Sequence, residues 1–327
     1  MMNPYIGHPT QLSGVEEHRL IGGQGDGMRL YEVHNQSGLD LVLSPDRNLD
    51  ITRLHFRGIN MSYMSPCGYV APAYYDASES NWLKSFTAGF LTTCGLQQVG
   101  SPCVDEGEVL PLHGSIANHP CEHSYWEEDE DEIRVHAINR DEVIFGRKLV
   151  LKRTVAVSKQ ENRFRIKDRI INTGDRLEPV EILYHMNMGY PLLDEDSVVT
   201  IPSAEVRARD QHAGEDLANW MHMEKPQPGY QERCYYHTFT GNEAVVGIFQ
   251  PKLQMGLSIT FDPQMLDGFV EWKMMGVRDY VLGLECGNCL PDGRDVMRKT
   301  GMLKFLKPGE KLKYEVTCRM LSSSPRL

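Results

Sequence analysis

Short apolar runs separated by glycine, proline, asparagine and aspartate recur along the whole chain. In several of them apolar and polar residues alternate, as in residues 163–170, where Phe164 and Ile166 lie between arginine and lysine residues. A period of two is typical of strands in a sheet with one solvated face. Turn sequences such as those at 172–175 and 307–310 separate consecutive runs, and no strand–helix–strand rhythm is present. The pattern predicts an all-β, mainly antiparallel fold with its strands paired as packed sheets.

The predicted strands include nine runs, at residues 40–43, 133–138, 145–157, 163–171, 180–188, 244–250, 256–261, 280–284 and 312–321. One segment departs from this pattern. In residues 77–89, Ser78 can cap a helix, and Trp82, Phe86 and Phe90 follow at intervals of four residues. This segment is therefore predicted to be helical.

The chain shows no internal boundary. Its 327 residues contain neither a linker rich in serine, glycine or proline nor an internal repeat, so we expect a single domain over residues 1–327. Residues 207–237 are polar and show little alternation, which is typical of a long functional or disordered excursion. The acidic run at 127–132 is expected to form a solvated hairpin tip rather than a cation site.

The charge balance excludes several classes of partner. With 45 Asp and Glu against 34 Lys and Arg, the formal net charge is −11. Nucleic acids and anionic lipid surfaces are bound by clustered lysine and arginine, so we expect no nucleic acid and no membrane as a partner. No basic leader and no long apolar run is present, which predicts a cytoplasmic protein with its eight cysteines reduced. Monomer and homodimer both stay open.

Three short segments place a titratable side chain beside small residues. His113 is followed by Gly114, which permits close approach of a ligand or another chain segment. His185 and Asn187 share one face of a predicted strand by the period of two. Glu285 lies in an otherwise apolar strand.

A structural role is the alternative for each of these residues. A histidine near a strand end often only completes a hydrogen-bond network, and Glu285 could pair with Arg278 or Arg294. Two histidines and one carboxylate in three similar settings still favour an active site, for which geometry is the deciding test.

A metal site is a competing hypothesis. His119, Cys121 and His123 would project from one face of a strand, but their spacing matches no familiar zinc pattern. Cys286 and Cys289 form a C-x-x-C sequence without the strand–helix–strand context of a redox pair. No glycine-rich phosphate loop or nucleophile elbow is present. We therefore expect no metal and no cofactor.

Four segments, at residues 82–96, 110–114, 184–193 and 282–292, resemble the galactose mutarotase (aldose 1-epimerase) superfamily. The similarity extends over essentially the whole chain in the same order, and it is to a divergent subgroup of uncharacterised aldose-epimerase-like proteins. The resemblance implies a galactose mutarotase-like β-supersandwich with few short helices, whose concave sheet face holds a small-molecule sugar.

Carried over residue by residue, the resemblance implies three principal roles. His113 resembles the substrate-binding histidine of the family, Glu285 its catalytic base and His185 its catalytic acid. An alignment anchored on Tyr190 would place Met188 at the position of the acid. His185 is preferred because methionine has no proton to transfer.

Six further residues are expected to contact the substrate. Two of them come from a motif of the divergent subgroup, and a structural ion pair is the alternative role for these two. One is a carboxylate that could bind a sugar hydroxyl, one is a tryptophan that could stack on a sugar ring, and two are asparagines. These residues are Arg47, Asp50, Glu232, Trp272, Asn187 and Asn288.

The resemblance implies an isomerase that interconverts sugar anomers by opening and closing the ring, with general acid–base catalysis and no cofactor. Because one fold supports many functions, a carbohydrate-binding protein without turnover, a lyase or a carbon epimerase on the same fold is the alternative.

Overall fold

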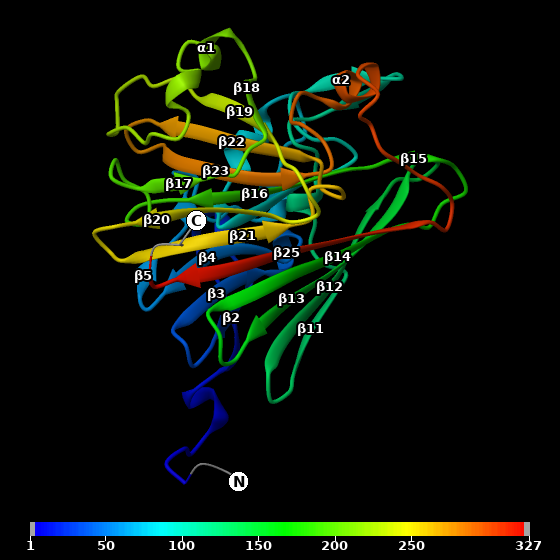
Figure 1. The fold of residues 1–327 in the computed structure, drawn as a ribbon. Helices are drawn as coiled ribbons and strands as arrows, with labels where there is room; N and C mark the ends of the chain where they lie inside the picture. Colours follow the sequence, from blue (N-terminus) through cyan, green and yellow to red (C-terminus); the bar gives the residue numbers. More distant parts are fainter. Residues whose placement is uncertain (1–3, 324–327) are drawn as a thin grey trace.

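Strands in which apolar and polar residues alternate form three large antiparallel sheets in the computed structural model, which describes residues 4–323 (Figure 1). The eight-stranded sheet has the order β11(His123–Glu128), β12(Glu132–Glu142), β13(Lys148–Ser158), β14(Arg163–Asn172), β25(Lys311–Leu321), β21(Met255–Phe261), β20(Ala244–Gln250) and β17(Val198–Thr200). The six-stranded sheet has the order β18(Glu205–Ala208), β19(Arg233–Thr238), β22(Gly268–Met275), β23(Tyr280–Gly287), β16(Glu181–Met188) and β8(Leu91–Leu96). The five-stranded sheet runs from β1 to β5: β1(Gly14–Arg19), β2(Arg29–His34), β3(Leu39–Ser44), β4(Asp50–Phe56) and β5(Ile59–Asn60).

Shorter elements connect these sheets. Three two-stranded pairs are formed by β6(Tyr63–Met64) with β7(Ala88–Gly89), β9(Cys103–Asp105) with β10(Glu108–Leu110), and β15(Glu178–Pro179) with β24(Phe305–Leu306). The two α-helices of the described residues are α1(Gln211–Gly214) and α2(Arg294–Lys299). The 3₁₀ turns are η1(Pro9–Gln11), η2(Gly23–Gly25), η3(Pro45–Arg47), η4(Pro72–Tyr74), η5(Asn81–Ser85), η6(Ile116–Asn118) and η7(Leu217–Asn219).

The predicted all-β, mainly antiparallel fold is confirmed. Each of the nine predicted strands is present, with ends that differ by a few residues. β12 extends four residues beyond its predicted end at residue 138, and residues 145–147 belong to the turn between β12 and β13 rather than to a strand. The acidic run lies at the β11–β12 hairpin, where Arg134 pairs with Glu127 and Asp129.

The helix predicted at residues 77–89 is wrong. The segment contains the five-residue turn η5 and then the short strand β7, in which Ala88 pairs with Met64. Ala88 has a positive φ of 62°, which no α-helix contains. The four-residue spacing of the aromatic residues suggested one helical face. In the structure Trp82 packs in a different apolar cluster from Phe90, so the aromatic residues do not share one face.

The six-stranded sheet is covered on both faces, and this sets the position of the site. Along β16, Tyr184 and Met186 pack into the main core between the sheets, whereas Leu183 packs into a smaller cluster on the opposite face. Every residue of β16 is buried. In Figure 1, β16, β22 and β23 lie above the long strands of the eight-stranded sheet.

Six of the eight cysteines are buried and two are partly buried, while their redox state stays a prediction. Among residues 4–323, no helix is long and apolar enough to cross a bilayer.

A buried arginine joins all three large sheets. Arg153 of β13 donates two hydrogen bonds to Asp168 of β14, from Nε at 2.9 Å and from Nη2 at 2.7 Å. Its Nη1 donates to Asp50 of β4 and to Thr93 of β8, each at 2.8 Å. The Tyr184 hydroxyl of β16 donates to Asp168 at 2.8 Å. The network therefore holds β4, β8 and β16 onto the eight-stranded sheet.

Burial and ion pairing act in opposite directions on Asp50. Loss of water raises the pKa of its carboxyl to about 6, although Arg153 and the hydrogen bonds from Thr93 act to lower it. The carboxylate form thus depends on the arginine.

Replacing this arginine should destabilise the fold strongly. Arg153→Met leaves two buried carboxyls without their cation, and breaking a buried pair in this way typically costs about 3–5 kcal/mol in the free energy of unfolding. Urea unfolding measures the loss, with Arg169→Met as the matched control because Arg169 is exposed on β14. Equal stability of the two variants would contradict the linking role of Arg153.

Candidate active site

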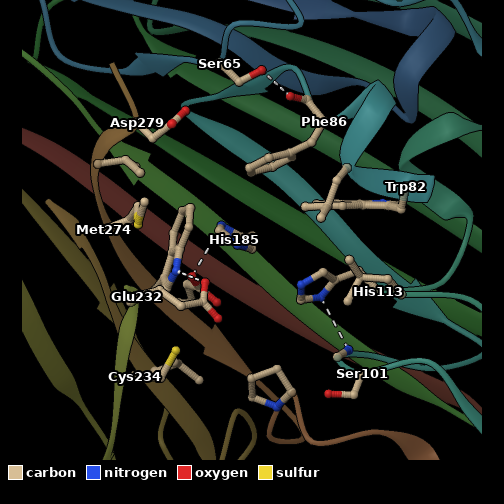
Figure 2. Close-up of a pocket in the computed structure, with 18 of the residues that line it drawn as sticks. Ser65, Trp82, Phe86, Ser101, His113, His185, Glu232, Cys234, Met274 and Asp279 are labelled. Atoms are coloured by element: carbon tan, nitrogen blue, oxygen red, sulfur yellow. Dashed lines mark hydrogen bonds and ion pairs between the residues drawn. The ribbon is translucent and has the colours of Figure 1, made fainter. Parts of the chain in front are cut away.

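A cavity of about 900 Å³ lies on the face of the six-stranded sheet that points away from the main core. Strands β16, β22 and β23 form its floor, and η5, the loop before His113 and the segment around Arg209 and Glu232 form its walls. Figure 2 shows His185, His113 and Glu232 around the cavity, with Trp82 and Phe86 on one side. Its volume is within the range of pockets that bind small molecules.

Glu285 and His185 form the centre of this cavity. They lie opposite each other in the antiparallel pair β16–β23, so the sheet register itself brings them together. Glu285 Oε1 lies 3.3 Å from His185 Nδ1, and both side chains are buried. Neither atom has a hydrogen-bond partner of normal geometry in the described part of the chain.

Gly283 makes room for the carboxyl group. It precedes Glu285 by two residues on the same face of β23. A Cβ atom at this position would collide with Glu285 Oε1. The absence of a side chain therefore permits Glu285 to lie over its own strand.

His113 reaches the cavity from a loop rather than from a strand. Its backbone adopts a positive φ of 56°, and the next residue, Gly114, has a φ of 71° and is closely packed against Gly95. The His113 ring is 4.8 Å from the ring of Trp82 and 5.7 Å from that of His185, measured between centroids. Two segments that are distant in sequence thus place two imidazoles in contact.

Trp272 and Glu232 form a second wall. The indole Nε1 of Trp272 donates to Glu232 Oε2 at 2.7 Å, and Arg209 donates to Glu232 Oε1 at 3.0 Å. The Trp272 ring lies 5.1 Å from the His185 ring. These contacts fix the tryptophan beside the catalytic candidates and connect it to the excursion predicted at residues 207–237. The ends of that range are part of the sheet, in β18 and β19, so only residues 209–232 leave it.

Burial moves the pKa values of the central groups in opposite directions. It raises the pKa of Glu285 well above its usual range, helped by the nearby Glu232 carboxylate. It lowers the pKa of His185 to about 4 and that of His113 to about 3, the latter also because of the neighbouring His185. The opposite directions of these shifts favour a proton on Glu285 over a proton on His185 whenever the pair holds a single proton.

Of the predicted site residues, five line the cavity and four lie elsewhere. His113, His185, Glu232, Trp272 and Glu285 line it. The four others are buried in structural contacts outside its lining: Arg47, Asp50, Asn187 and Asn288.

These four side chains make contacts within the protein. Arg47 donates to the carbonyl of Val70, and Asp50 belongs to the Arg153 network. Asn187 Nδ2 donates to the backbone carbonyl of His185. Asn288 bridges backbone groups of neighbouring segments, accepting from the Ile182 amide at 2.8 Å.

Sequence reasoning did not select several lining residues, among them Trp82, Phe86, Arg209, Asp279 and Asp292. The available signals were the aromatic spacing at Trp82 and Phe86, which we interpreted as a helical stripe, and the polar excursion that contains Arg209. Asp279 carried no such signal.

The competing hypothesis of a metal site concerns His119, Cys121 and His123. Within residues 4–323, no three His, Cys, Asp or Glu side chains are grouped so that they could hold a metal ion. His119 instead contacts the carbonyl of Arg140, and His123 lies against Tyr125.

Comparisons with known proteins agree with the fold. A family model described as a domain of unknown function, DUF4432, matches residues 25–320. No curated protein matches the chain. A solved structure described as a putative aldose 1-epimerase from Klebsiella pneumoniae subsp. pneumoniae MGH 78578 has a TM-score of 0.89 and 24% identity, covering 95% of this chain and 84% of that chain.

Two further solved structures extend the comparison. A galactose 1-epimerase from Lactobacillus acidophilus NCFM has a TM-score of 0.66 and 13% identity, covering 95% of this chain and all, 100%, of that chain. A galactose mutarotase-like protein from Clostridium acetobutylicum has a TM-score of 0.67 and 12% identity, covering 95% and 99%. The resemblance seen in the sequence is thus confirmed at the level of the fold.

The buried carboxyl should lower stability in a pH-dependent way. Because the pKa of Glu285 is higher in the folded than in the unfolded protein, its contribution is most favourable below about pH 4 and is lost as pH rises toward the folded pKa. Glu285→Gln cannot ionise, so its stability relative to wild type should increase between pH 5.5 and 8, by about 1 kcal/mol or more. Urea unfolding at both pH values measures this.

Glu315→Gln, which removes an exposed carboxylate from β25, is the control for the loss of one charge. It should show no such increase. A Glu285→Gln difference that does not vary with pH would contradict the raised pKa.

Proposed function

We propose an aldose 1-epimerase-like activity for this chain, which belongs to the DUF4432 family and has the fold of galactose mutarotase-like proteins. The observation that carries the proposal is the contact between Glu285 and His185 on the floor of the cavity. A carboxyl and an imidazole with oppositely shifted pKa values are suited to moving protons between two oxygens of one substrate.

Interconversion of anomers requires two coupled proton transfers. During ring opening one group removes the proton of the anomeric hydroxyl, while another protonates the ring oxygen. The carbonyl group that results rotates, and the ring closes on its other face with the two roles exchanged. Each residue therefore acts once as an acid and once as a base, and the pair ends with the single proton with which it began.

The shifted pKa values assign the first step. With the shared proton on Glu285, this residue donates to the ring oxygen and His185 accepts the hydroxyl proton. The resemblance to the family implies the opposite order, with Glu285 as the first base. A pair that shares one proton supports both orders, because ring opening and ring closure are the reverse of each other.

The walls of the cavity fit a sugar. Trp82, Phe86 and Trp272 provide aromatic surface on which the C–H face of a pyranose can pack. His113 and Glu232 add polar groups that can hold hydroxyls. The activity needs no metal and no cofactor, because every step is a proton transfer.

A binding protein without turnover is the alternative. In that case we would expect Glu285 to be held by Arg278 and to point away from the histidines. Glu285 instead contacts His185, and Arg278 is not part of the cavity lining. A buried carboxyl without a proper hydrogen bond lowers stability, and groups of this kind cluster at functional sites, where catalytic acids and bases need shifted pKa values.

Substitution of either central residue should abolish most of the activity. Freshly dissolved single-anomer sugars, both neutral and acidic, are followed by polarimetry or by NMR of the anomeric protons. Glu285→Gln and His185→Asn should each reduce kcat by about 100-fold or more, as loss of a general acid–base group does.

His123→Asn is the matched control, because His123 is exposed on β11 and is not part of the cavity lining. It should keep wild-type kcat. If Glu285→Gln exchanged anomers as fast as wild type, the assignment of Glu285 would be lost. If wild type accelerated no sugar while still binding one, the binding alternative would be correct.

The rate should depend on pH through a bell-shaped profile. Activity needs one proton on the pair, so it falls as pH decreases toward about 4, where His185 gains a second proton. It falls again as pH rises through the raised pKa of Glu285, where the pair loses its last proton. The residual rate of His185→Asn should lack the acidic limb. An acidic limb that persists in this variant would assign it to another group.

A further inference from the structure

A second cavity, of about 390 Å³, adjoins the first. Its lining includes Arg53 and His55 of β4, Tyr190 after β16, and Arg278 before β23. Arg53 and His55 are two residues apart, so they share one face of the strand. Residues 60–64 supply the rest of the lining together with Tyr280, so four segments of the chain converge on it.

The lining of this second cavity contains no carboxylate. Its charged or titratable members are Arg53, Arg278 and His55, together with neutral polar groups such as Asn60 and Ser62. The chain has 45 acidic and 34 basic residues, yet the charged side chains that line this cavity are both arginines. They create a local positive potential.

The two arginines are exposed, and their guanidinium donors face solvent rather than a protein partner. Among the described residues, neither the Arg53 nor the Arg278 guanidinium forms an ion pair or a hydrogen bond, and Arg53 only lies over the ring of Tyr69, at 5.7 Å. Elsewhere many arginines are ion-paired, as Arg29 is with Asp46 at 2.8 Å. A guanidinium presents a planar set of N–H donors that matches carboxylate and phosphate oxygens.

The shape of the site is held by hydrogen bonds that do not involve the arginines. Asn60 Nδ2 donates to the carbonyls of Ser62 at 2.7 Å and Tyr190 at 2.8 Å. These bonds fix Tyr190 against β5 and the residues that follow it. The cavity is therefore formed before any ligand is present, which lowers the entropic cost of binding.

Tyr63 connects the second cavity to the first, since it lines both. Its hydroxyl lies 3.3 Å from the carbonyl of Arg278 and 3.4 Å from Asp279 Oδ1. Asp279 belongs to the lining of the first cavity, where Figure 2 shows it at the edge. A ligand group beside Arg278 would thus lie next to the first cavity, with Tyr63 in contact with both sites.

We propose that the second cavity is an oxyanion site, in which Arg53 and Arg278 bind a phosphate or carboxylate group. The group belongs either to a free anion or to a charged substituent of the molecule in the first cavity. The proposal concerns binding alone, so it stands or falls independently of the anomer-exchange activity.

Inorganic phosphate is the first probe. Isothermal titration at low ionic strength should show one site per chain in wild type. Arg53→Gln and Arg278→Gln should each weaken phosphate binding by about tenfold or more, as loss of a charge-assisted hydrogen bond implies. Arg169→Gln, which removes an exposed and unpaired charge from β14, should bind like wild type. Added salt should weaken binding through screening.

A hexose with a terminal phosphate and the same hexose without it distinguish the two sources. If the anion is a substituent of the sugar, the phosphorylated hexose binds more tightly than the neutral one, and Arg278→Gln removes only that difference. If the anion is free, inorganic phosphate and the neutral hexose bind together without competition. Both outcomes support the oxyanion site.

Two results would overturn the proposal. One is the absence of phosphate and sugar-phosphate binding to wild type. The other is equal phosphate affinity of Arg53→Gln, Arg278→Gln and the Arg169→Gln control, which would assign binding to another part of the surface. Neither result affects anomer exchange of neutral sugars, so a failure here is distinct from a failure of the proposed activity.

Discussion

The buried ion pairs of Arg153 hold the architecture together, because they connect strands from all three large sheets. A guanidinium with Asp168 on one side and Asp50 on the other pairs with both carboxylates, and all three side chains are buried. Such a pair adds little net stability compared with apolar packing, but breaking it is costly. It therefore specifies how the sheets are placed rather than supplying the free energy of folding.

The position of the site follows from this placement. Tyr184 bonds to Asp168 on the core face of β16, while the next residue, His185, faces the cavity on the opposite side. The register of β16 with β23 then sets Glu285 opposite His185. The structural network and the proposed catalytic pair thus use consecutive residues of β16, which point to opposite faces of the strand. A strand with only one buried face could not carry both.

The sequence predicted the fold class well because sheet strands carry a local signal, the alternation seen in residues 163–170. It failed at residues 77–89, where the aromatic spacing was helical but tertiary packing separates Trp82 from Phe90. His113, His185 and Glu285 were selected from short motifs and a family resemblance. Such motifs indicate which residue types are suited to the chemistry, but not how far apart their side chains lie in the folded protein.

The placement of other residues could not be read from the sequence. Asp50 and Asn288 have the polar character of binding residues, yet their partners are strands that are distant in sequence. Arg209 reaches the cavity from the segment that follows β18, and Asp279 from the turn between β22 and β23. Burial and pairing of this kind depend on contacts between segments, for which single-residue patterns contain no information.

The central claim is that Glu285 and His185 act as one pair with a single shared proton near neutral pH. NMR observation of the Glu285 side-chain carbon and the His185 ring nitrogens, across a pH titration from 4 to 9, measures the protonation of both groups directly. The account predicts a protonated Glu285 and a neutral His185 at pH 6. An ionised Glu285 beside a neutral His185 at that pH would leave the pair without a proton and would contradict the account.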